Sequence, residues 1–353
     1  MPYQFFHQYL QTKKGFKFLS FIIAGLLIVA VYKIYSDFFS PNVKGSAKQF
    51  SIIYVPSTKN FDRFCYELQA KDVLMNIQSF KRFGKLLNLD EKLKPGRYKV
   101  EAGMSNYELV KILMRGSQES VNLVFNYAER AEDLASFFGR NLELDSTAFL
   151  HLLKSPDEAK LHGFDTNTFV SMFIPNTYNF YWNTNSIELI KRMDKEYKKF
   201  WTQERIAKSI HQKLSQVEVS ILASIVQKES NKESEMPVIA GVYLNRLRKG
   251  IPLQADPTVI YAWNDKSIRR VSSVHTAIQS PYNTYMNAGL PPGPICVPGI
   301  KAIDAVLNAA EHDYFYFCAR EDFSGYHSFA ATFQQHQVNA RRYQQALNRN
   351  NIQ

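Results

Sequence analysis

The sequence predicts an α+β protein with a single N-terminal transmembrane helix, a small α/β module and a larger mixed α+β domain. Three observations predict this class: an uncharged apolar run near the start, strand-like and helical segments that alternate over residues 48–120, and a strongly helical pattern from Ser186 onward. The 353 residues, 45% of them hydrophobic, suffice for one large domain or two modest ones with real cores.

The apolar run extends from Phe18 to Tyr32, and Lys17 and Lys33 at its ends can snorkel their aliphatic stems to lengthen it. A cleaved signal peptide is the alternative, but no small-x-small cleavage site follows the run. We therefore expect an uncleaved membrane anchor at residues 18–35, preceded by a tail at 1–17 and followed by a polar linker at 36–47.

The charges on either side of the run predict its orientation. The tail carries Lys13, Lys14 and Lys17 and no acidic residue, whereas Asp37 lies beyond the run. The positive-inside rule then places the tail in the cytoplasm. Everything from about Ser40 onward is expected outside the membrane.

The chain is basic, with 43 Lys and Arg against 32 Asp and Glu and a net charge of +11. Such a charge favours an anionic partner, whether nucleic acid, membrane lipid or an acidic polymer. The basic residues are scattered, however, and neither a basic helix nor an aromatic ribonucleoprotein motif is present. The pattern argues against nucleic acid as the partner.

Residues 48–120 and 121–345 are expected to form two successive domains. The first is predicted to contain, in order, strand Phe50–Val55, helices Phe61–Leu68 and Ser79–Leu87, strand Gly96–Val100 and helix Asn106–Arg115. The second is predicted to begin with strand Val121–Phe125 and helices Ala131–Leu142, Ser146–Leu153, Ile187–Trp201 and Gln203–Leu214.

The next predicted helix carries the most informative residue of the chain. Ser215 and Glu218 have the Ser-x-x-Glu spacing of a capping box, which fixes the start of the helix. Positions at spacings of three and four then define one face, which holds Val219, Leu222, Ile225, Val226 and Glu229. A carboxyl group at the end of an apolar face is unusual and suggests catalysis.

A general acid must hold its proton near neutral pH, which requires a glutamate pKa raised from about 4.3 toward 6 or 7. Three features are expected to raise the pKa of Glu229: the apolar face beneath it, the partial negative charge of the helix C-terminus, and like charge from Glu233 and Glu235. The alternative is a surface glutamate that forms an ion pair with Lys232.

Three loops downstream combine amides, tyrosines and rigid Pro/Gly turns. These residues suit a sugar-binding groove, because hydroxyl groups need two-sided hydrogen bonding and pyranose faces stack on aromatic rings. The loops are Gln254-Ala255-Asp256-Pro257-Thr258, Ser280-Pro281-Tyr282-Asn283-Thr284-Tyr285 and Gly289-Leu290-Pro291-Pro292-Gly293-Pro294.

Together with Leu222–Glu229, Asn245-Arg246-Leu247, Leu253–Tyr261, Pro298-Gly299 and His327-Ser328-Phe329, these loops closely resemble the endolytic murein transglycosylase (YceG-like) family. The motifs keep their order and spacing from Leu222 to Phe329. The resemblance implies one membrane helix, a LysM-like module at 48–120 and a transglycosylase catalytic domain at 121–345. It also implies a single-pass protein of the bacterial inner membrane with a periplasmic catalytic domain.

The activity implied by the resemblance is non-hydrolytic cleavage of the MurNAc-GlcNAc β-1,4 bond within peptidoglycan glycan strands, which terminates nascent strands. Glu229 would protonate the glycosidic oxygen and then accept a proton from the C6 hydroxyl of the same MurNAc, which leaves a 1,6-anhydro end. A single carboxylate suffices because the nucleophile is internal to the substrate. No cofactor is implied, and the expected partners are glycan strands and cell-wall synthesis proteins.

Six further residues are candidates for holding the sugars beside the cut: Gln254, Asp256, Tyr282, Asn283, Tyr285 and His327. Asp256 has an alternative interpretation, since an Asp before Pro commonly shapes a turn. His327 and His336 lack an HExxH or comparable ligand pair, so no metal is expected.

The chain departs from the pattern of the family at several positions. Gln227 stands where many members carry Glu, which leaves Glu229 as the matching acid on this helix. Val170 and Ser171 replace a usual Glu-Gly, and Asn176 replaces Asp, which raises the question of a different substrate preference.

Two other functions remain open at this point. One is a retaining hydrolase with Glu229 as acid and Asp256 as nucleophile. The other is a membrane-tethered, non-enzymatic peptidoglycan-binding or scaffold protein.

Overall fold

The structure of the protein is a computed structural model that describes residues 13–46, 49–268 and 270–350. It contains two compact units, which are described separately. The first extends to Val121 and includes Phe180–Asn183, and the second holds Asn122–Asn179 and the chain from Thr184 onward. Residues 1–12 of the predicted cytoplasmic tail lie outside the described residues.

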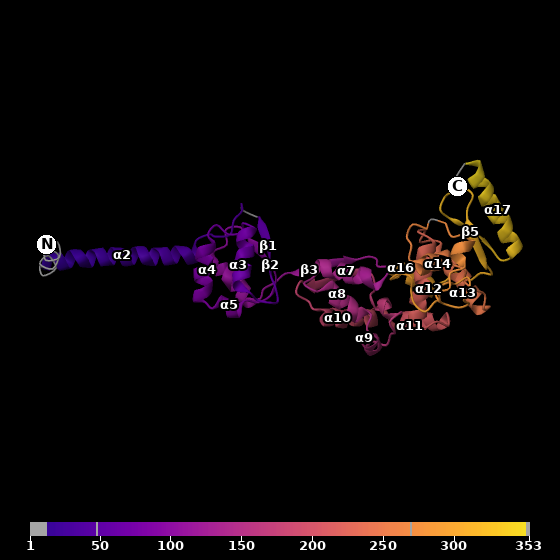
Figure 1. Cartoon of the computed structure of the whole chain (residues 1–353), viewed down its shortest axis with the longest axis horizontal. Helices are drawn as coiled ribbons and strands as arrows, with labels where there is room; N and C mark the ends of the chain where they lie inside the picture. Colours follow the sequence, from indigo (N-terminus) through magenta and orange to yellow (C-terminus); the bar gives the residue numbers. More distant parts are fainter. Residues whose placement is uncertain (1–12, 47–48, 269, 351–353) are drawn as a thin grey trace. The chain divides into compact units, whose positions relative to one another are not determined.

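The first unit begins with α2 (Lys13–Phe39), a long helix that is apolar enough over Gly15–Phe39 to cross a membrane (Figure 1). Its apolar side chains point outward, as those of Phe21 and Ile28 do. The helix runs past the predicted end at residue 35, so residues 36–39 are helical rather than linker. Contacts to Asp37 explain the extension, because its carboxylate pairs with Arg82 at 2.6 Å and its carbonyl accepts from Asn106 at 2.7 Å.

The rest of the first unit is a two-stranded antiparallel sheet covered by helices. Strand β1 (Phe50–Val55) pairs with β2 (Gly96–Glu101), with Ile53 opposite Tyr98. Alternate residues of both strands face a core built mainly from aromatic and branched side chains. The helices are α3 (Phe61–Ala70), α4 (Ile77–Leu86), α5 (Leu89–Lys92) and α6 (Asn106–Arg115).

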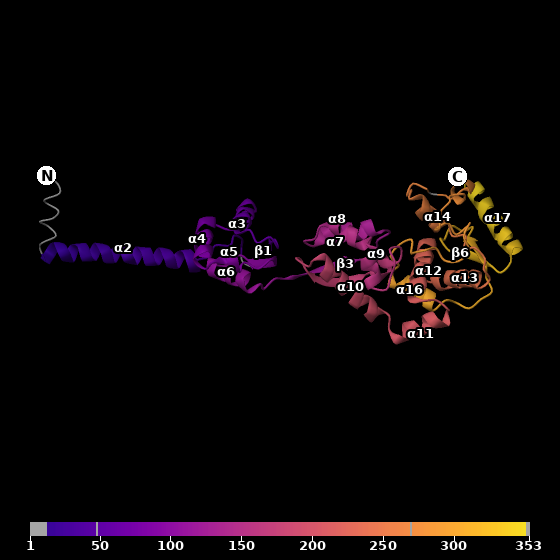
Figure 2. The same cartoon turned by 60° about the horizontal axis from the view of Figure 1, so that its bottom comes forward.

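Strand β3 (Ser120–Phe125) pairs with β4 (Asn176–Tyr181), and the second unit takes up the chain within β3, at Asn122. A cluster of aromatic rings holds the helices of this part together, with Phe138 at 5.9 Å from Phe149 and 6.1 Å from Phe173, centroid to centroid. Figure 2 shows these helices: α7 (Ala131–Asn141), α8 (Ser146–Leu153), α9 (Pro156–Leu161) and α10 (Ser186–Phe200), with a 3-10 turn η1 at Phe169–Met172.

The remainder of the second unit is a group of helices around α12 (Gln216–Glu229), with a hairpin beside them. Helix α12 packs against its neighbours α13, α14 and α16. The helices are α11 (Gln203–His211), α13 (Met236–Arg248), α14 (Asp256–Trp263), α15 (Ser273–Thr276) and α16 (Ile300–Leu307).

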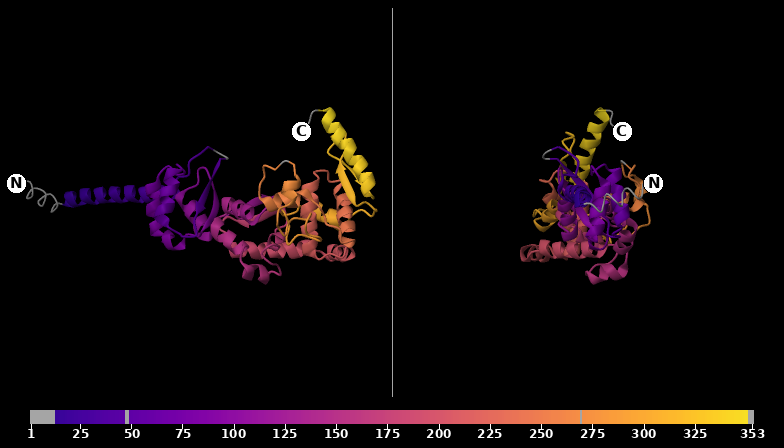
Figure 3. Two further views of the ribbon diagram at one scale, coloured as in Figure 1. Left: turned by 45° about the vertical axis from the view of Figure 1, so that its right-hand side comes forward. Right: turned by 90° about the vertical axis from the view of Figure 1, so that its left-hand side faces the viewer.

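The hairpin pairs β5 (Tyr316–Ala319) antiparallel to β6 (His327–Ala330). The last helix, α17 (Phe333–Arg349), lies against this hairpin, as Figure 3 shows at the yellow end of the chain. The predicted α+β class is therefore observed in both units.

Candidate active site

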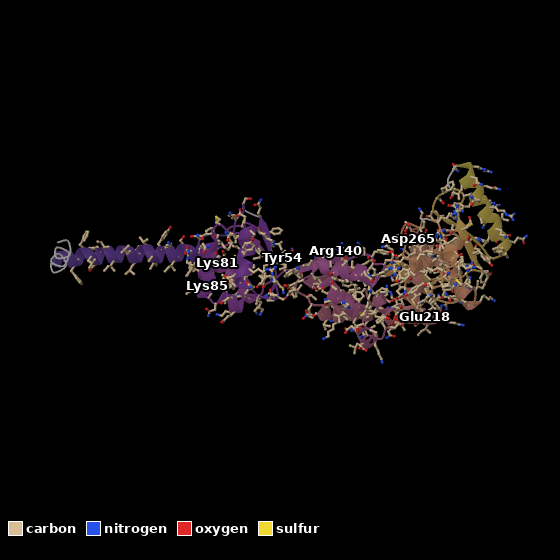
Figure 4. The ribbon with its side chains drawn as sticks, viewed as in Figure 1. Tyr54, Lys81, Lys85, Arg140, Glu218 and Asp265 are labelled. Atoms are coloured by element: carbon tan, nitrogen blue, oxygen red, sulfur yellow. The ribbon has the colours of Figure 1, made fainter. Side chains whose placement is uncertain are left out.

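Helix α12 places Glu229 at its last position. The predicted capping box is present: the backbone N–H of Ser215 donates to the Glu218 carboxylate at 2.7 Å, and the N–H of Glu218 donates to the Ser215 hydroxyl at 3.2 Å. Glu218, labelled in Figure 4, marks this first turn. All residues from Val219 to Val226 are buried, so the core holds the helix on every side and fixes the position of its end.

Glu229 lines a cavity of about 270 Å³ in the second unit. The cavity is lined by groups from α12, α13, the loop before α14, the first residue of α14, the loop after α15, strand β5 and helix α17. Besides Glu229, they are Tyr243, Arg246, Leu253, Gln254, Asp256, Tyr285, Tyr316, Phe317, Phe333 and His336. Polar groups and aromatic faces therefore meet around one carboxyl group.

Burial raises the pKa of Glu229 to about 7, because removal from water disfavours the carboxylate. A hydrogen bond from the Tyr243 hydroxyl to Glu229 Oε1, 2.5 Å long, acts in the opposite direction. The negative charge of Asp256 raises the pKa further, and the positive charge of Arg246 lowers it. The group can thus exist in both protonation states near neutral pH, as an acid that later acts as a base requires.

The like charge that acts on Glu229 comes from Asp256 rather than from the predicted Glu233 and Glu235. Glu233 forms an exposed ion pair with Lys301 at 2.6 Å. The carboxylate of Glu235 accepts from the backbone N–H of His327 at 2.8 Å and lies 2.9 Å from its Nδ1 atom. Both carboxylates have partners of their own, and neither is among the groups that shift the pKa of Glu229.

Lys232 does not form the ion pair with Glu229 that was the alternative expectation. Its ammonium group lies 5.0 Å above the ring of Tyr326, and its backbone N–H donates to Ser230. Glu229 is accordingly a partly buried carboxyl group held by a phenol rather than a surface glutamate paired with a lysine.

Arg246 connects α13 to the residue before β5 and to the loop before α14. Its guanidinium donates to the backbone carbonyls of Phe315 at 2.6 Å and Leu253 at 2.9 Å, and to Gln254 Oε1 at 3.2 Å. Arg246 is 7% exposed, so these bonds form away from water. They hold the loop before α14 in a fixed position relative to Glu229.

Gln254, Asp256 and Tyr285 are the predicted substrate-binding residues that line the cavity with Glu229. The Tyr285 hydroxyl donates to Asp256 Oδ1 at 2.5 Å. Asp256 is the first residue of α14, where a negative charge is favourable, so it starts a helix rather than shaping an isolated turn. Because Gln254 accepts from Arg246 through Oε1, its NH₂ group is the end available to a ligand.

Tyr282, Asn283 and His327 lie outside the lining of this cavity within the part of the chain that the structure describes. Asn283 is fully buried and donates to the carbonyls of Thr276 and Ile278, which orders the loop. The ring of Tyr282 packs against the ring of Tyr261, with centroids 4.9 Å apart. His327 is held by Glu235.

Seven lining residues were absent from the predicted site, and one of them, Leu253, directly precedes the predicted Gln254. Tyr243 and Arg246 lie three positions apart on α13 and therefore share a face, and Arg246 belongs to the Asn245-Arg246-Leu247 motif. Nothing local marks the other four, because the hairpin and α17 approach Glu229 only through tertiary packing. They are Tyr316, Phe317, Phe333 and His336.

The family departures have identifiable positions. Gln227 Oε1 accepts the backbone N–H of Gly299 at 2.6 Å, so this amide fixes the start of α16. Val170 and Ser171 are buried in η1, whereas Asn176 is exposed at the start of β4. Among residues 13–46, 49–268 and 270–350, no three His, Cys, Asp or Glu side chains gather in a group able to hold a metal ion.

Known proteins resemble this chain over most of its length. The model of the YceG-like family matches residues 53–342. A Bacillus subtilis (strain 168) protein named endolytic murein transglycosylase is 28% identical over 334 residues, which cover 88% of this chain and 89% of that protein. A Streptococcus pneumoniae (strain D39) protein of the same name is 26% identical over 352 residues, and the match covers 85% of this chain but 61% of the longer relative.

A solved structure is also similar. The crystal structure of a YceG-like protein from Listeria monocytogenes superimposes with a TM-score of 0.54 and 26% sequence identity. The match covers 83% of this chain and 99% of the other.

Proposed function

This chain belongs to the YceG-like family, and from that premise we propose that it is a lytic transglycosylase that cuts peptidoglycan glycan strands internally. The matched region, 53–342, contains Glu229 and the whole lining of its cavity. One observation carries the proposal: a carboxyl group whose pKa burial raises to about 7 opens into a cavity with polar and aromatic walls. Such a cavity suits a sugar, and such a carboxyl group suits proton transfer at neutral pH.

The proposed reaction needs no water and no second carboxylate. Protonated Glu229 gives its proton to the glycosidic oxygen as the bond from C1 of MurNAc to that oxygen breaks, and GlcNAc leaves with a hydroxyl group. The resulting carboxylate takes the proton of the MurNAc C6 hydroxyl while O6 bonds to C1. The strand then ends in 1,6-anhydro-MurNAc, and Glu229 is protonated again. The internal nucleophile supplies a high effective concentration.

We assign the sugar contacts next to the cut to Gln254, Asp256 and Tyr285, which line the cavity. The NH₂ group of Gln254 can donate to a sugar hydroxyl or acetamido oxygen. Tyr282 and His327 lie outside the cavity and would meet only more distant parts of a strand. Asn283 acts through the order that it gives to the loop before Tyr285.

The N-terminal elements fit a tethered enzyme. We propose that α2 is a single-pass anchor in the bacterial inner membrane, with the tail in the cytoplasm and the chain from about Ser40 onward in the periplasm. We propose that the β1–β2 sheet with its helices is the LysM-like module. An enzyme held at the membrane surface would meet newly made strands and cell-wall synthesis proteins there, and its cuts would terminate strand elongation.

The experiment is mass spectrometry of the products from purified glycan strands treated with the wild-type protein, with Glu229→Gln, and with Glu233→Gln as a matched control. We expect anhydro-muropeptides from the wild type and the control and no cleavage by Glu229→Gln. Reducing MurNAc ends would favour the retaining hydrolase. If the wild-type protein is folded but cleaves no strands, the result would favour a non-enzymatic binding or scaffold protein.

A further inference from the structure

The two oxygens of the Glu229 carboxyl group have different surroundings. Oε1 accepts the 2.5 Å hydrogen bond from Tyr243. Among the residues that the structure describes, none donates a hydrogen bond to Oε2. Oε2 is also not one of the fully buried polar atoms that lack a hydrogen-bond partner, so it is not sealed inside the protein. Since the residue lines the cavity, Oε2 is the oxygen that remains available to a ligand.

Tyr243 is itself held firmly. It is 2% exposed, and its ring packs edge-on against Phe317 with centroids 5.8 Å apart. Burial raises the pKa of Tyr243 well above its ordinary value, so the phenol stays protonated throughout the titration of Glu229 near pH 7. It is therefore a permanent donor to whichever form of Glu229 is present.

We propose that Tyr243 is a positioning residue that fixes Glu229 through Oε1 and thereby makes Oε2 the single oxygen that both delivers and accepts the proton. This inference rests on the proposed function. In the acid step, Oε1 serves as the carbonyl oxygen of the protonated group and Oε2 carries the proton. In the base step, the same bond stabilises the carboxylate and keeps Oε2 directed at the cavity, so one geometry serves both halves of the reaction.

The groups that surround Glu229 determine how the bond affects protonation. Asp256 at the start of α14 opposes ionisation, whereas Arg246 and the Tyr243 hydroxyl on α13 favour it. The other titratable groups that face the cavity are Tyr285, Tyr316 and His336. The pKa of His336 is lowered by burial and by Arg246, so it is neutral near pH 7.

Removal of the Tyr243 hydroxyl therefore has a defined sign. Because the bond favours the carboxylate, its loss raises the pKa of Glu229 above about 7. The enzyme starts its cycle with Glu229 protonated, so cleavage falls as pH rises through this pKa. The alkaline limb of the profile of kcat/KM against pH should move to higher pH, because the acid form survives longer.

The test uses the full-length protein in detergent micelles and purified glycan strands, with Tyr243→Phe compared to wild type from pH 5 to 9. We expect retained cleavage, an alkaline limb shifted upward by roughly half a unit to one unit, and a kcat that falls by about 10-fold or less with KM unchanged. Tyr98→Phe is the matched control, since it removes the hydroxyl of a buried tyrosine in the first unit that donates to the backbone carbonyl of Lys94. Its profile should coincide with that of the wild type.

A second measurement covers the case in which Tyr243→Phe is too unstable to assay. The infrared carbonyl band of protonated Glu229 is identified by its absence in Glu229→Gln, and in wild type its loss with rising pH reports the titration of Glu229. Replacement of tyrosine by ring-fluorinated tyrosine makes the Tyr243 phenol a stronger hydrogen-bond donor. That band should then titrate at lower pH. An unmoved band refutes the inference.

Two failures can be told apart. If Glu229→Gln abolishes cleavage while Tyr243→Phe leaves the alkaline limb unmoved and only lowers the unfolding temperature, Tyr243 is structural and the positioning role is refuted. If Glu229→Gln still cleaves strands, the assignment of the acid fails, and with it the proposed function on which the positioning role rests.

Discussion

Glu229→Gln is predicted to stabilise the protein at alkaline pH while it removes activity. The folded state holds the Glu229 proton more tightly than the unfolded chain, because burial raises the pKa from 4.5 to about 7. Between these two values the folded state binds more protons, so stability falls as pH rises. Below pH 4.5 the group contributes no such penalty, and above pH 7 the full penalty is present.

The size of the effect follows from the same two values. A pKa that moves from 4.5 to about 7 corresponds to about 3 kcal/mol of folding free energy lost by pH 8. Gln cannot ionise, yet its amide oxygen can still accept the hydrogen bond from Tyr243. The variant should therefore gain about 3 kcal/mol over wild type between pH 4.5 and pH 8, or roughly 6 to 12 °C in the unfolding temperature of a unit of this size.

Tryptophan fluorescence can follow the unfolding of the second unit, because Trp201 and Trp263 belong to it. Thermal unfolding of wild type, Glu229→Gln and Glu233→Gln should be measured at pH 5 and pH 8. Glu233 pairs with Lys301 in an exposed bridge, so its variant should show no comparable dependence on pH. Equal stability of wild type and Glu229→Gln at pH 8 would refute a pKa of Glu229 that burial raises to about 7.

Two further substitutions test other parts of the site. Asp256→Asn removes a charge that raises the pKa of Glu229. The alkaline limb of the profile of cleavage rate against pH should therefore move to lower pH, with activity retained. Abolished cleavage with intact folding would instead favour Asp256 as a nucleophile. Arg246→Lys cannot reach all the carbonyls that the guanidinium contacts, and we expect a loss of about 3 kcal/mol from the buried groups left unpaired. Thermal unfolding at constant pH measures this loss, and an unchanged unfolding temperature would contradict the bridging role.

Local sequence patterns predicted most of the helices and strands whose bounds are set by their own residues. The capping box at Ser215 marked the start of α12, and the apolar spacing after it marked a buried face. The strand at Phe50–Val55 was predicted at its observed bounds from a run of β-branched and aromatic residues. The end of α2 was misplaced, because the contacts that carry the helix to Phe39 come from Arg82 and Asn106.

The same division applies to the site. Gln254, Asp256 and Tyr285 were chosen as polar and aromatic residues in loops, and they line the cavity with Glu229. Asn283 was chosen by the same criterion, yet its side chain is turned inward and bonded to its own loop. Residue type alone does not reveal which way a loop side chain points, since that depends on which backbone groups of the folded loop still need a hydrogen-bond partner.

The sequence by itself determined that this chain has a helix able to cross a membrane, two α+β units and one carboxyl group at the end of a buried helix, because hydrophobic period and capping are local properties. Only the tertiary structure decided what surrounds that carboxyl group. Tyr243 and Arg246 on α13 and Asp256 at the start of α14 act on Glu229 in opposing directions, and the packing of α12 against α13 and α14 brings these segments together. A protonation state depends on burial and neighbours in space, and neither is written in the order of the residues.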